Sequence, residues 1–273
     1  MLISVVTPSY NLARFLPRTI DSVVSQAGDF ELEYLVIDGG STDGTLEILK
    51  RCQDDLTAGR IKAACAGFSF RWFSEKDRGQ SDAINKGLRM ARGEVAAYLN
   101  ADELLAPRCL QTVSDFFRLN PGQKLLTGYC RIIDEDGHEI RKAITWYKNI
   151  LLGIPSFKNL LKENFISQPA TFWRRDVHIE LGYFDEGLRY AMDYDMWCRM
   201  ASKYRINVIR NHLADFRWYR QSKSGGGFGA QFEEEYRIAL RYLDKRPMLK
   251  LIHRFNIVKT TAVYRLWNLI GGT

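Results

Sequence analysis

The residues best suited to hold a metal ion are Asn100, Ala101, Asp102 and Glu103, which directly follow an apolar run at residues 95–99. Mg²⁺ and Mn²⁺ prefer oxygen ligands and usually keep coordination positions for phosphate oxygens. A carboxylate exposed in a cleft at the end of a strand could therefore hold such an ion. The alternative is a solvated turn that caps the element beginning at Leu104. This segment alone leaves both interpretations open.

Two further polar groups are candidates for binding a ligand. Asp38 opens a glycine-rich segment at residues 38–44, where glycines would let the backbone approach a phosphate at the start of the next helix. Ser41 or Asp43 could equally serve only to cap that helix. The second group is denser and surrounds one helical turn; its members are Asp77, Arg78, Gln80, Asp82 and Asn85. A structural helix start does not require all of these together, so a ligand-binding role stands beside that of a capped, solvated helix start.

Asp193 and Asp195 open another predicted helix, at residues 193–203. Either carboxylate could take a proton from an attacking hydroxyl group as a general base. Acidic residues at a helix N-terminus are also stabilised by the helix dipole, which is the structural alternative. Their spacing does not choose between these interpretations.

The elements that would position these groups alternate between strand and helix. Short apolar runs at residues 3–6, 34–37, 71–74 and 95–99 predict strands, and helical spacing of apolar residues predicts helices between them, including one at 81–91. This alternation predicts βαβ units and a largely parallel sheet. In such sheets ligands bind at the carboxyl ends of the strands, and the groups at 38–44, 77–87 and 100–103 all follow predicted strands.

The second half is less regular. We expect strands at residues 125–133, 139–140, 170–173, 205–209 and 215–219, with a hairpin turn at 134–137. An amphipathic helix is expected at 150–163, and the chain becomes helical and basic after the glycines at 225–227.

The 273 residues carry a net charge of +7 and a pI near 9.1, which indicates anionic partners. Much of the excess lies in the C-terminal tail, whose mixture of basic and apolar residues predicts either peripheral contact with an anionic membrane or a helix packed back on the domain. The basic residues are not interleaved with aromatic residues in the way single-strand binders require, so we expect no nucleic acid partner.

The five cysteines are scattered and form no CxxC pair, which predicts reduced thiols and a cytoplasmic location, with the inner face of the cytoplasmic membrane as the place of any membrane contact. The sequence shows no leader and no apolar stretch long enough to span a bilayer. We therefore expect a soluble or peripheral protein.

Together the motifs resemble family 2 glycosyltransferases, and among them the subgroup of bacterial surface-polysaccharide biosynthesis. The resemblance covers residues 2–224, in the expected order. The motifs are VVTPSYN (5–11), IDGGSTDGT (37–45), SEKDRGQSDAINKG (74–87), LNADE (99–103), QPATFWRR (168–175) and AMDYDMW (191–197).

This resemblance implies a GT-A fold, an α/β architecture with a mixed, mostly parallel central sheet flanked by helices. Residues 1–103 would form a Rossmann-like nucleotide-sugar-binding half and residues 104–224 an acceptor-binding half with the catalytic base. Residues 225–273 would form a helical, basic C-terminal extension. The implied reaction is inverting, metal-dependent transfer of a sugar from a nucleotide diphosphate sugar, UDP-sugar by default, to a hydroxyl of a saccharide or lipid-linked saccharide.

The resemblance also assigns roles to individual residues. Asp193 matches the catalytic base, and Asp102 matches the aspartate that binds Mn²⁺ or Mg²⁺. The residues implied to bind the nucleotide sugar are Thr7, Pro8, Tyr10, Asp38, Asp77, Arg78, Asp82, Asn100, Ala101 and Lys223, the last as a phosphate contact in a loop.

The sequence departs from the family pattern at four positions. Asn100 begins the metal motif and Glu103 ends it, Gly39 stands where many relatives carry a second aspartate, and Tyr219 stands where relatives often carry a histidine. A degenerate transferase that only binds ligands is therefore one alternative. A nucleotidyltransferase is another, although its usual glycine-rich signature is not found after the first strand. A dinucleotide oxidoreductase is disfavoured because no GxGxxG follows that strand.

Overall fold

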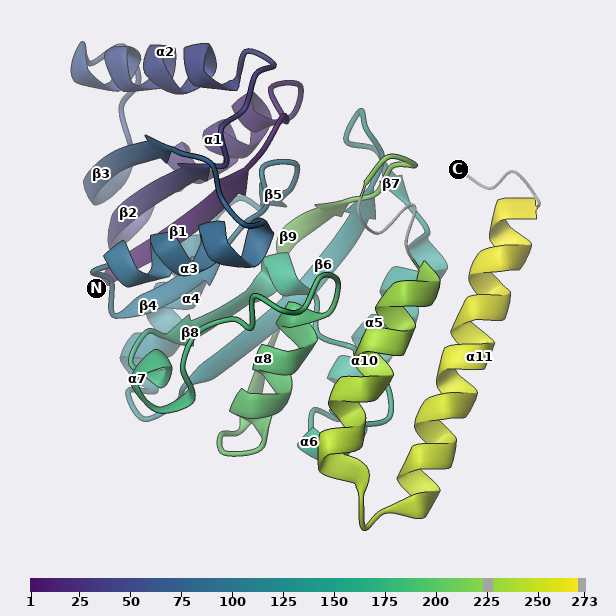
Figure 1. The fold of residues 1–273 in the computed structure, drawn as a ribbon. Helices are drawn as coiled ribbons and strands as arrows, with labels where there is room; N and C mark the ends of the chain where they lie inside the picture. The colour runs from purple at the N-terminus through teal and green to yellow at the C-terminus, as the bar shows by residue number, and fades with distance from the viewer. Residues whose placement is uncertain (223–227, 270–273) are drawn as a thin grey trace.

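The computed structural model describes residues 1–222 and 228–269, with the side chains of 228 and 263–269 left aside. One curled, mixed sheet runs through the molecule, with helices on both faces (Figure 1). The strands in order across the sheet are β3 (Cys65–Ser74), β2 (Gly28–Asp38), β1 (Leu2–Ser9), β4 (Val95–Tyr98), β8 (Thr171–Arg174), β6 (Leu125–Ile133), β9 (Ile206–Arg217) and β5 (Leu104–Leu105). The short β7 (Glu139–Ile140) pairs with β6.

The first four strands, β1 to β4, are parallel to one another, which confirms the predicted βαβ arrangement. The crossovers contain α1 (Leu16–Val24), α2 (Thr45–Thr57) and α3 (Gln80–Met90). β1 is almost entirely buried because strands flank it on both edges and helices cover both faces. Parallel pairing brings the carboxyl ends of these strands to one edge of the sheet.

The second half turns the sheet from parallel to mixed. β8 runs antiparallel to both β4 and β6, whereas β6 and β9 are parallel. The helical elements around these strands are α4 (Cys109–Leu119), α5 (Lys142–Leu152), α6 (Phe157–Leu160), the 3-10 turn Gln168–Ala170, α7 (Val177–Leu181) and α8 (Met192–Ala201).

Two predicted boundaries in this half are wrong. The predicted helix at residues 150–163 is instead the end of α5 and the separate α6, because Pro155 offers no backbone N–H and disfavours a helical residue before it. The predicted strands at 205–209 and 215–219 are one continuous strand, β9, whose register against β6 shifts beside Gly128 and Tyr129. A single long strand reaches from the base of the sheet to the functional edge.

The C-terminal helices α10 (Phe228–Leu243) and α11 (Pro247–Leu269) pack on the second half. The described side chains Ile238, Ala239 and Leu243 are fully buried in the same hydrophobic cluster as Trp197 of α8. This packing confirms that the tail is helical. The predicted divisions at residues 103 and 224 stay predictions, since one sheet joins the two halves and one hydrophobic cluster includes the tail.

A buried carboxylate holds the base of the first half together. Glu33 of β2 is fully buried and accepts hydrogen bonds from Ser4 Oγ at 2.6 Å, Arg92 Nε at 2.8 Å and Arg71 Nη2 at 2.8 Å. Burial alone would raise the pKa of Glu33, but these donors, with the Arg92 backbone N–H, hold it below its ordinary value.

We expect Glu33→Ala to lower the free energy of unfolding by about 3 kcal/mol, because it leaves several buried donors without their charged acceptor. Urea unfolding at neutral pH measures this loss. Glu31→Ala, an exposed residue two positions earlier on the same strand, is the matched control and should change stability little. Equal stability of the two variants would contradict the structural role of Glu33.

Candidate active site

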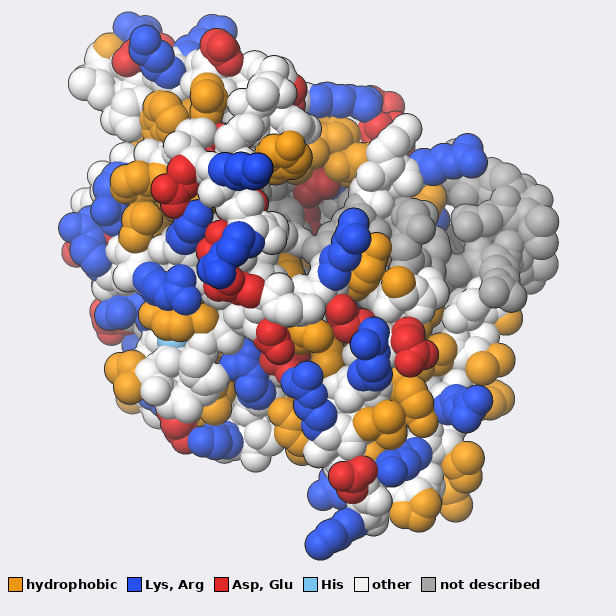
Figure 2. All heavy atoms as spheres, viewed as in Figure 1, with side chains coloured by type: hydrophobic (Ala, Val, Ile, Leu, Met, Phe, Trp, Pro, Cys, Tyr) orange, Lys and Arg blue, Asp and Glu red, His pale blue; other side chains and the backbone are white. Residues whose placement is uncertain are grey.

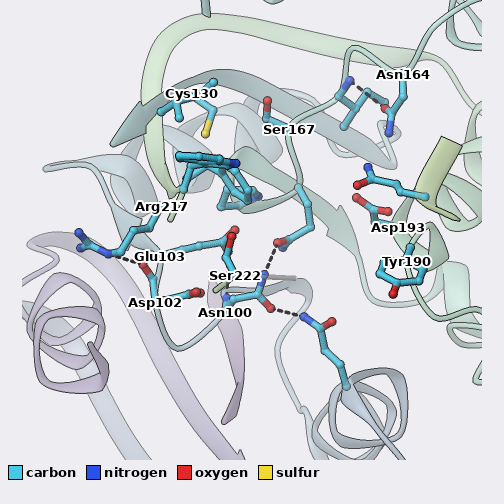
Figure 3. A pocket seen from close by; sticks show the side chains of 18 of the residues that line it. Asn100, Asp102, Glu103, Cys130, Asn164, Ser167, Tyr190, Asp193, Arg217 and Ser222 are labelled. Carbon is cyan, nitrogen blue, oxygen red and sulfur yellow. Dashed lines mark hydrogen bonds between the residues drawn. The ribbon is translucent and has the colours of Figure 1, made fainter. Parts of the chain in front are cut away.

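A cleft of about 860 Å³ lies at the carboxyl ends of β1 and β4. Its floor includes the loop after β4, and its far wall is built by the start of α8 and by residues of α5, α10 and α11. Seven of the residues predicted from the sequence line it: Pro8, Tyr10, Asp77, Asn100, Ala101, Asp102 and Asp193. Segments that are far apart in the sequence thus meet in one cleft (Figure 3).

Two residues at the end of β9 hold Asp102 in place. The Tyr219 hydroxyl donates to Asp102 Oδ2 at 2.9 Å, and Arg217 Nε donates to the Asp102 carbonyl oxygen at 2.9 Å. Phe15 packs against both partners, with its ring centroid 5.0 Å from the Tyr219 ring and 5.0 Å from the guanidinium carbon. Burial raises the pKa of Asp102, and the Tyr219 hydrogen bond and the Arg217 charge oppose that rise.

Glu103 lies next to Asp102 and is buried. Its carboxylate accepts the backbone N–H of Asn100 at 3.0 Å. Burial, together with the negative charges of Asp102 and Asp193, raises the pKa of Glu103 to about 8. The charges of Asp102 and Asp193 therefore oppose ionisation of Glu103 in this cleft.

A chain of side-chain amides fixes the loop after β4. Gln80 Nε2 at the start of α3 donates to Asn100 Oδ1 at 2.6 Å, and Asn100 Nδ2 donates to Gln168 Oε1 at 3.3 Å (Figure 3). Gln168 Nε2 in turn donates to the carbonyl oxygen of Tyr98 at 2.6 Å. Asn100, which departs from the family pattern, is thus a connecting member of this chain.

The two aspartates that open α8 have different environments. Asp195 is buried and bonded to Arg199 Nε at 2.8 Å and Arg241 Nη1 at 2.9 Å. Asp193 lines the cleft, where its Oδ1 also accepts the backbone N–H of Tyr194 at 2.8 Å. Asp193 lies across the cleft from Asp102 (Figure 3). Of this pair, Asp193 is therefore the one that can meet a substrate.

Glu234 of α10 caps the start of α8. Its carboxylate accepts the backbone N–H groups of Arg189 at 3.0 Å, Tyr190 at 2.6 Å and Ala191 at 2.7 Å. Burial alone would raise the pKa of Glu234, but these donors hold it below its ordinary value. Because Asp193 lies in the first turn of α8, this cap fixes its backbone.

The next residue, Glu235, lines the cleft itself. It accepts a hydrogen bond from Gln231 Nε2 at 3.1 Å, and burial raises its pKa to about 7, with the Asp193 charge adding to the rise. The C-terminal helices therefore form part of the site.

Thr7 and Asp38, two of the predicted nucleotide contacts, do not line the cleft. Their side chains are bonded to other parts of the protein. Thr7 is buried, with its hydroxyl 3.1 Å from the Tyr34 hydroxyl. Asp38 is also buried, and its carboxylate accepts hydrogen bonds from Ser74 Oγ at 2.7 Å and from the backbone N–H groups of Gly40 and Ser41 at 3.0 and 2.9 Å. In this arrangement Asp38 shapes the loop, and its role as a nucleoside contact stays a prediction.

Gly39 lies directly against Asp77. A Cβ atom at Gly39 would come within 2.4 Å of Asp77 Oδ2, so a side chain there would displace that carboxylate. Burial raises the pKa of Asp77, whose Oδ1 accepts the Gly79 N–H at 2.9 Å. Many relatives carry a second aspartate at the position of Gly39. In this chain the Asp77 carboxylate lies beside that position instead.

Arg78 and Asp82 line a second, smaller cavity of about 430 Å³. Arg78 Nη2 lies 3.2 Å from Asp82 Oδ1 and 2.6 Å from Glu186 Oε2, and Lys86 Nζ lies 3.4 Å from Asp82 Oδ2. The predicted diphosphate contact of Arg78 and Asp82 therefore competes with an internal ion-pair network. The predicted phosphate contact Lys223 lies outside the described residues.

A separate acidic group, formed by Asp134, Asp136 and His138, lies at the turn between β6 and β7. Asp134 Oδ1 accepts the backbone N–H groups of Asp136, Gly137 and His138, at 3.0, 2.8 and 2.8 Å. These bonds explain the group as a hairpin turn, as its sequence predicted.

Several functional residues had no clear sequence signal. Tyr219 was identified only as a departure from the family pattern, and Arg217, at the end of β9, had no signal of its own. Gln168 lies within the QPATFWRR motif, which gives it no role of its own. Glu234 and Glu235 belong to a run of three glutamates that resembles any solvated helix face.

The fold and the cleft define an α/β enzyme of the GT-A type, in which polar groups at the carboxyl ends of parallel strands face a mixed second half. The chain belongs to glycosyl transferase family 2, whose family model matches residues 4–182. Residues 4–182 are therefore a glycosyltransferase domain. This confirms the family, the fold class and the enzyme class expected from the motifs.

Curated relatives include chondroitin synthase of Escherichia coli, 28% identical over 200 residues, covering 73% of this chain and 26% of that protein. An uncharacterised glycosyltransferase of Nostoc is 34% identical over 145 residues, covering 53% of this chain and 41% of that protein. Another uncharacterised glycosyltransferase, of Methanocaldococcus jannaschii, is 28% identical over 222 residues, covering 79% of this chain and 70% of that protein. The chain spans 26% of the length of the chondroitin synthase and 41% of that of the Nostoc protein.

Two solved structures share the fold. Mannosyltransferase PcManGT from Pyrobaculum calidifontis, in complex with GDP-Man and Mn²⁺, has a TM-score of 0.69 at 19% identity, covering 99% of this chain and 76% of that one. S. aureus TarS 1–349, in complex with UDP-GlcNAc, has a TM-score of 0.66 at 17% identity, covering 89% of this chain and 67% of that one.

We expect Glu234→Ala to lower the free energy of unfolding by about 2 kcal/mol and turnover by about tenfold, because the N-terminus of α8 loses its acceptor and Asp193 is less well positioned. Glycosyl transfer assays and thermal unfolding measure both effects. Glu233→Ala changes the exposed neighbouring glutamate and should leave both unchanged. If the two variants behaved alike, the cap would not support the site.

Proposed function

We propose that this chain is an inverting, metal-dependent glycosyltransferase that moves a sugar from a nucleotide diphosphate sugar to a hydroxyl group of a saccharide or lipid-linked saccharide in cell-surface polysaccharide biosynthesis. The observation that carries the proposal is the placement of Asp102 and Asp193 across one cleft (Figure 3). One carboxylate can then serve the leaving diphosphate while the other serves the attacking hydroxyl.

The residues around Asp102 fit a divalent cation. Asp102 and Glu103 supply the hard oxygen ligands that Mn²⁺ and Mg²⁺ prefer, and burial raises the pKa of both. Asp102 would hold the ion, with Glu103 adjacent to it and Tyr219 orienting the Asp102 carboxylate. When bound, the ion supplies electrostatic stabilisation of the charge that develops on the leaving diphosphate.

Asp193 would act as the general base. Its carboxylate takes the proton of the acceptor hydroxyl while that oxygen bonds to the anomeric carbon. The bond between the anomeric carbon and the diphosphate oxygen breaks in the same displacement, and the nucleoside diphosphate leaves with the bonding electron pair. A single displacement inverts the anomeric carbon and requires no nucleophile from the enzyme.

The donor would lie against the ends of β1 and β4, with Tyr10 and Asp77 at the nucleoside end of the cleft. The Asp77 carboxylate beside Gly39 supports this placement, because it lies next to the loop that the family uses for the nucleoside. Uridine is the base we propose. The five free cysteines, four of them buried, support work in a reducing cytoplasm where such donors would be met.

The acceptor would enter from the side formed by α5, α10 and α11. Tyr147, Lys148, Trp218 and Lys259 line this part of the cleft. The Arg141 guanidinium lies 3.5 Å from the centre of the Trp218 ring and holds that ring in the wall. Flat aromatic surfaces with polar neighbours suit a saccharide, which has apolar faces and hydroxyl edges.

Asp193→Asn should lower turnover by about 100-fold or more while nucleotide binding persists, because an amide cannot accept the hydroxyl proton. Single-turnover transfer and nucleotide titration separate these effects. Asp195→Asn is the matched control, since it weakens the bonds to Arg199 and Arg241 and should cost stability more than turnover of the folded enzyme. Near-normal turnover of Asp193→Asn would exclude Asp193 as the base.

Thermal unfolding against UDP, GDP, dTDP and NAD, each with and without Mn²⁺, tests the donor and the metal. A nucleotide at a hundred times its dissociation constant should add about 2.7 kcal/mol of stability, and we expect that shift with UDP and Mn²⁺. No shift with any diphosphate would favour a degenerate binding module.

Tyr219→Phe should weaken Mn²⁺ binding about tenfold by freeing the Asp102 carboxylate, whereas Tyr147→Phe, elsewhere in the cleft, should not.

A further inference from the structure

The helix α11 packs with one face and exposes an apolar opposite face. Its inner face places Leu249 and His253 against the domain, with His253 Nδ1 2.8 Å from the carbonyl oxygen of Leu161. The outer face carries Met248 at 68% exposure, Leu251 at 66%, Phe255 at 68% and Val258 at 62%. Their spacing of three or four residues aligns them in one stripe along the helix. Figure 2 shows hydrophobic side chains along the outer edge of α11, interspersed with basic ones.

A second exposed apolar group lies on the adjoining helix α5 and just beyond it. Its members are Trp146, Ile150 and Ile154. Of the eleven large hydrophobic side chains that are exposed among the described residues, seven belong to these two groups. Scattered single exposures are normal on a protein surface, but a concentration of this kind marks an interaction site.

The two groups turn to the same side of the molecule. α5 and α11 touch where Lys259 Nζ lies 2.8 Å from the Tyr147 hydroxyl. An α-helix turns by about 100° per residue. Lys259 therefore lies roughly 60° around the axis of α11 from the centre of its apolar stripe, and Tyr147 roughly 80° around the axis of α5 from its apolar residues. Both angles are measured in the direction of increasing residue number. Between helices that run in opposite directions, contact through matching flanks turns the two apolar groups the same way. We call these seven residues the α5–α11 face.

The charge around the α5–α11 face is mostly positive. Residues 142–162 and 245–262 contain nine lysines and arginines and no aspartate or glutamate. The exposed members are Lys142, Lys158, Lys245, Arg246 and Arg254. Exposed Asp244, just before this stretch, is paired with Lys250 at 3.5 Å. An apolar stripe bordered by cations is the pattern of helices that lie in the interface of an anionic bilayer.

We propose that the α5–α11 face docks on an anionic lipid surface, with α11 parallel to the membrane plane. Among the described residues, no helix has the length and apolarity to cross a bilayer, so the docking is interfacial. A second copy of the chain would have to bring these five exposed cations against five like charges, whereas anionic headgroups complement them. The lipid surface is therefore the partner that the charge favours.

Docking would also set the acceptor side of the cleft beside the headgroups. Lys259 and Thr260 belong to α11 and line the cleft. The docked orientation therefore favours the lipid-linked form of the acceptor, a consequence that rests on the proposed transfer reaction. The docking itself does not rest on it.

Flotation of the full chain with vesicles tests the proposal. We expect binding to vesicles of phosphatidylethanolamine with phosphatidylglycerol, weaker at high salt, and little binding to phosphatidylcholine alone. Leu251→Gln with Phe255→Gln should lower the partition coefficient about tenfold or more, because it removes the centre of the apolar stripe. The matched control is Leu119→Gln with Ile179→Gln, two apolar residues that are 81% and 89% exposed elsewhere.

A second pair of variants tests the charge. Lys245→Gln, Arg246→Gln and Arg254→Gln together should lower binding to anionic vesicles by a similar factor, whereas Lys50→Gln, Arg51→Gln and Lys62→Gln, which remove the same charge from exposed positions on and after α2, should lower it much less. Thermal unfolding shows that each variant is folded.

Absence of vesicle binding, or equal binding by all variants, would overturn the docking. So would a wild-type dimer that ignores vesicles and dissociates in the Leu251→Gln, Phe255→Gln variant, as seen by light scattering, because the face would then join two copies. Nucleotide titration without vesicles is a separate measurement on the same protein. A failure of the proposed donor and a failure of the docking are therefore distinguishable.

Discussion

The central constraint on this structure is the crowding of Asp102, Glu103 and Asp193 in one partly buried cleft. Burial and the charges of Asp102 and Asp193 oppose ionisation of Glu103, which a fixed donor or a cation would favour. The long strand β9 brings Tyr219 and Arg217 to Asp102, and α10 brings Glu234 to the helix that carries Asp193. Much of the second half can be understood as the scaffold that holds these groups apart yet facing one another.

The first half of the fold could be predicted from the sequence because its signals are local. Apolar runs that end in polar residues mark parallel strands, and their carboxyl ends necessarily meet at one edge. That logic brought together Asp77 and Asp102, whereas Tyr10 was assigned by the resemblance to the family. Asp193 was a harder case, since spacing left it equal to Asp195. The ion pairs of Asp195 with Arg199 and Arg241 separate the two, and Arg241 is 46 residues away in the sequence.

The rest could not be predicted because it depends on contacts between distant segments. Arg217 bonds to the carbonyl oxygen of Asp102 from 115 residues away, and nothing in its own neighbourhood reveals that partner. Asp38, the expected nucleoside contact, also has a partner that its own neighbourhood in the sequence does not reveal. Its motif is local, but its carboxylate bonds to Ser74 at the end of the neighbouring strand. The helix break at Pro155 was the one local signal missed, because the apolar periodicity continues on both sides of it.

The C-terminal helices connect the chemistry to the surface on which it would take place. The two interpretations of the basic tail, packing on the domain and contact with a membrane, are compatible because α11 has two faces. Burial of Leu249 and His253 fixes the helix, and a fixed helix presents Leu251 and Phe255 as a rigid stripe without a further ordering cost. The same tail supplies Glu234 to the start of α8. Displacement of the tail would therefore disturb Asp193, so the proposed docking and the proposed catalysis would depend on the same helices.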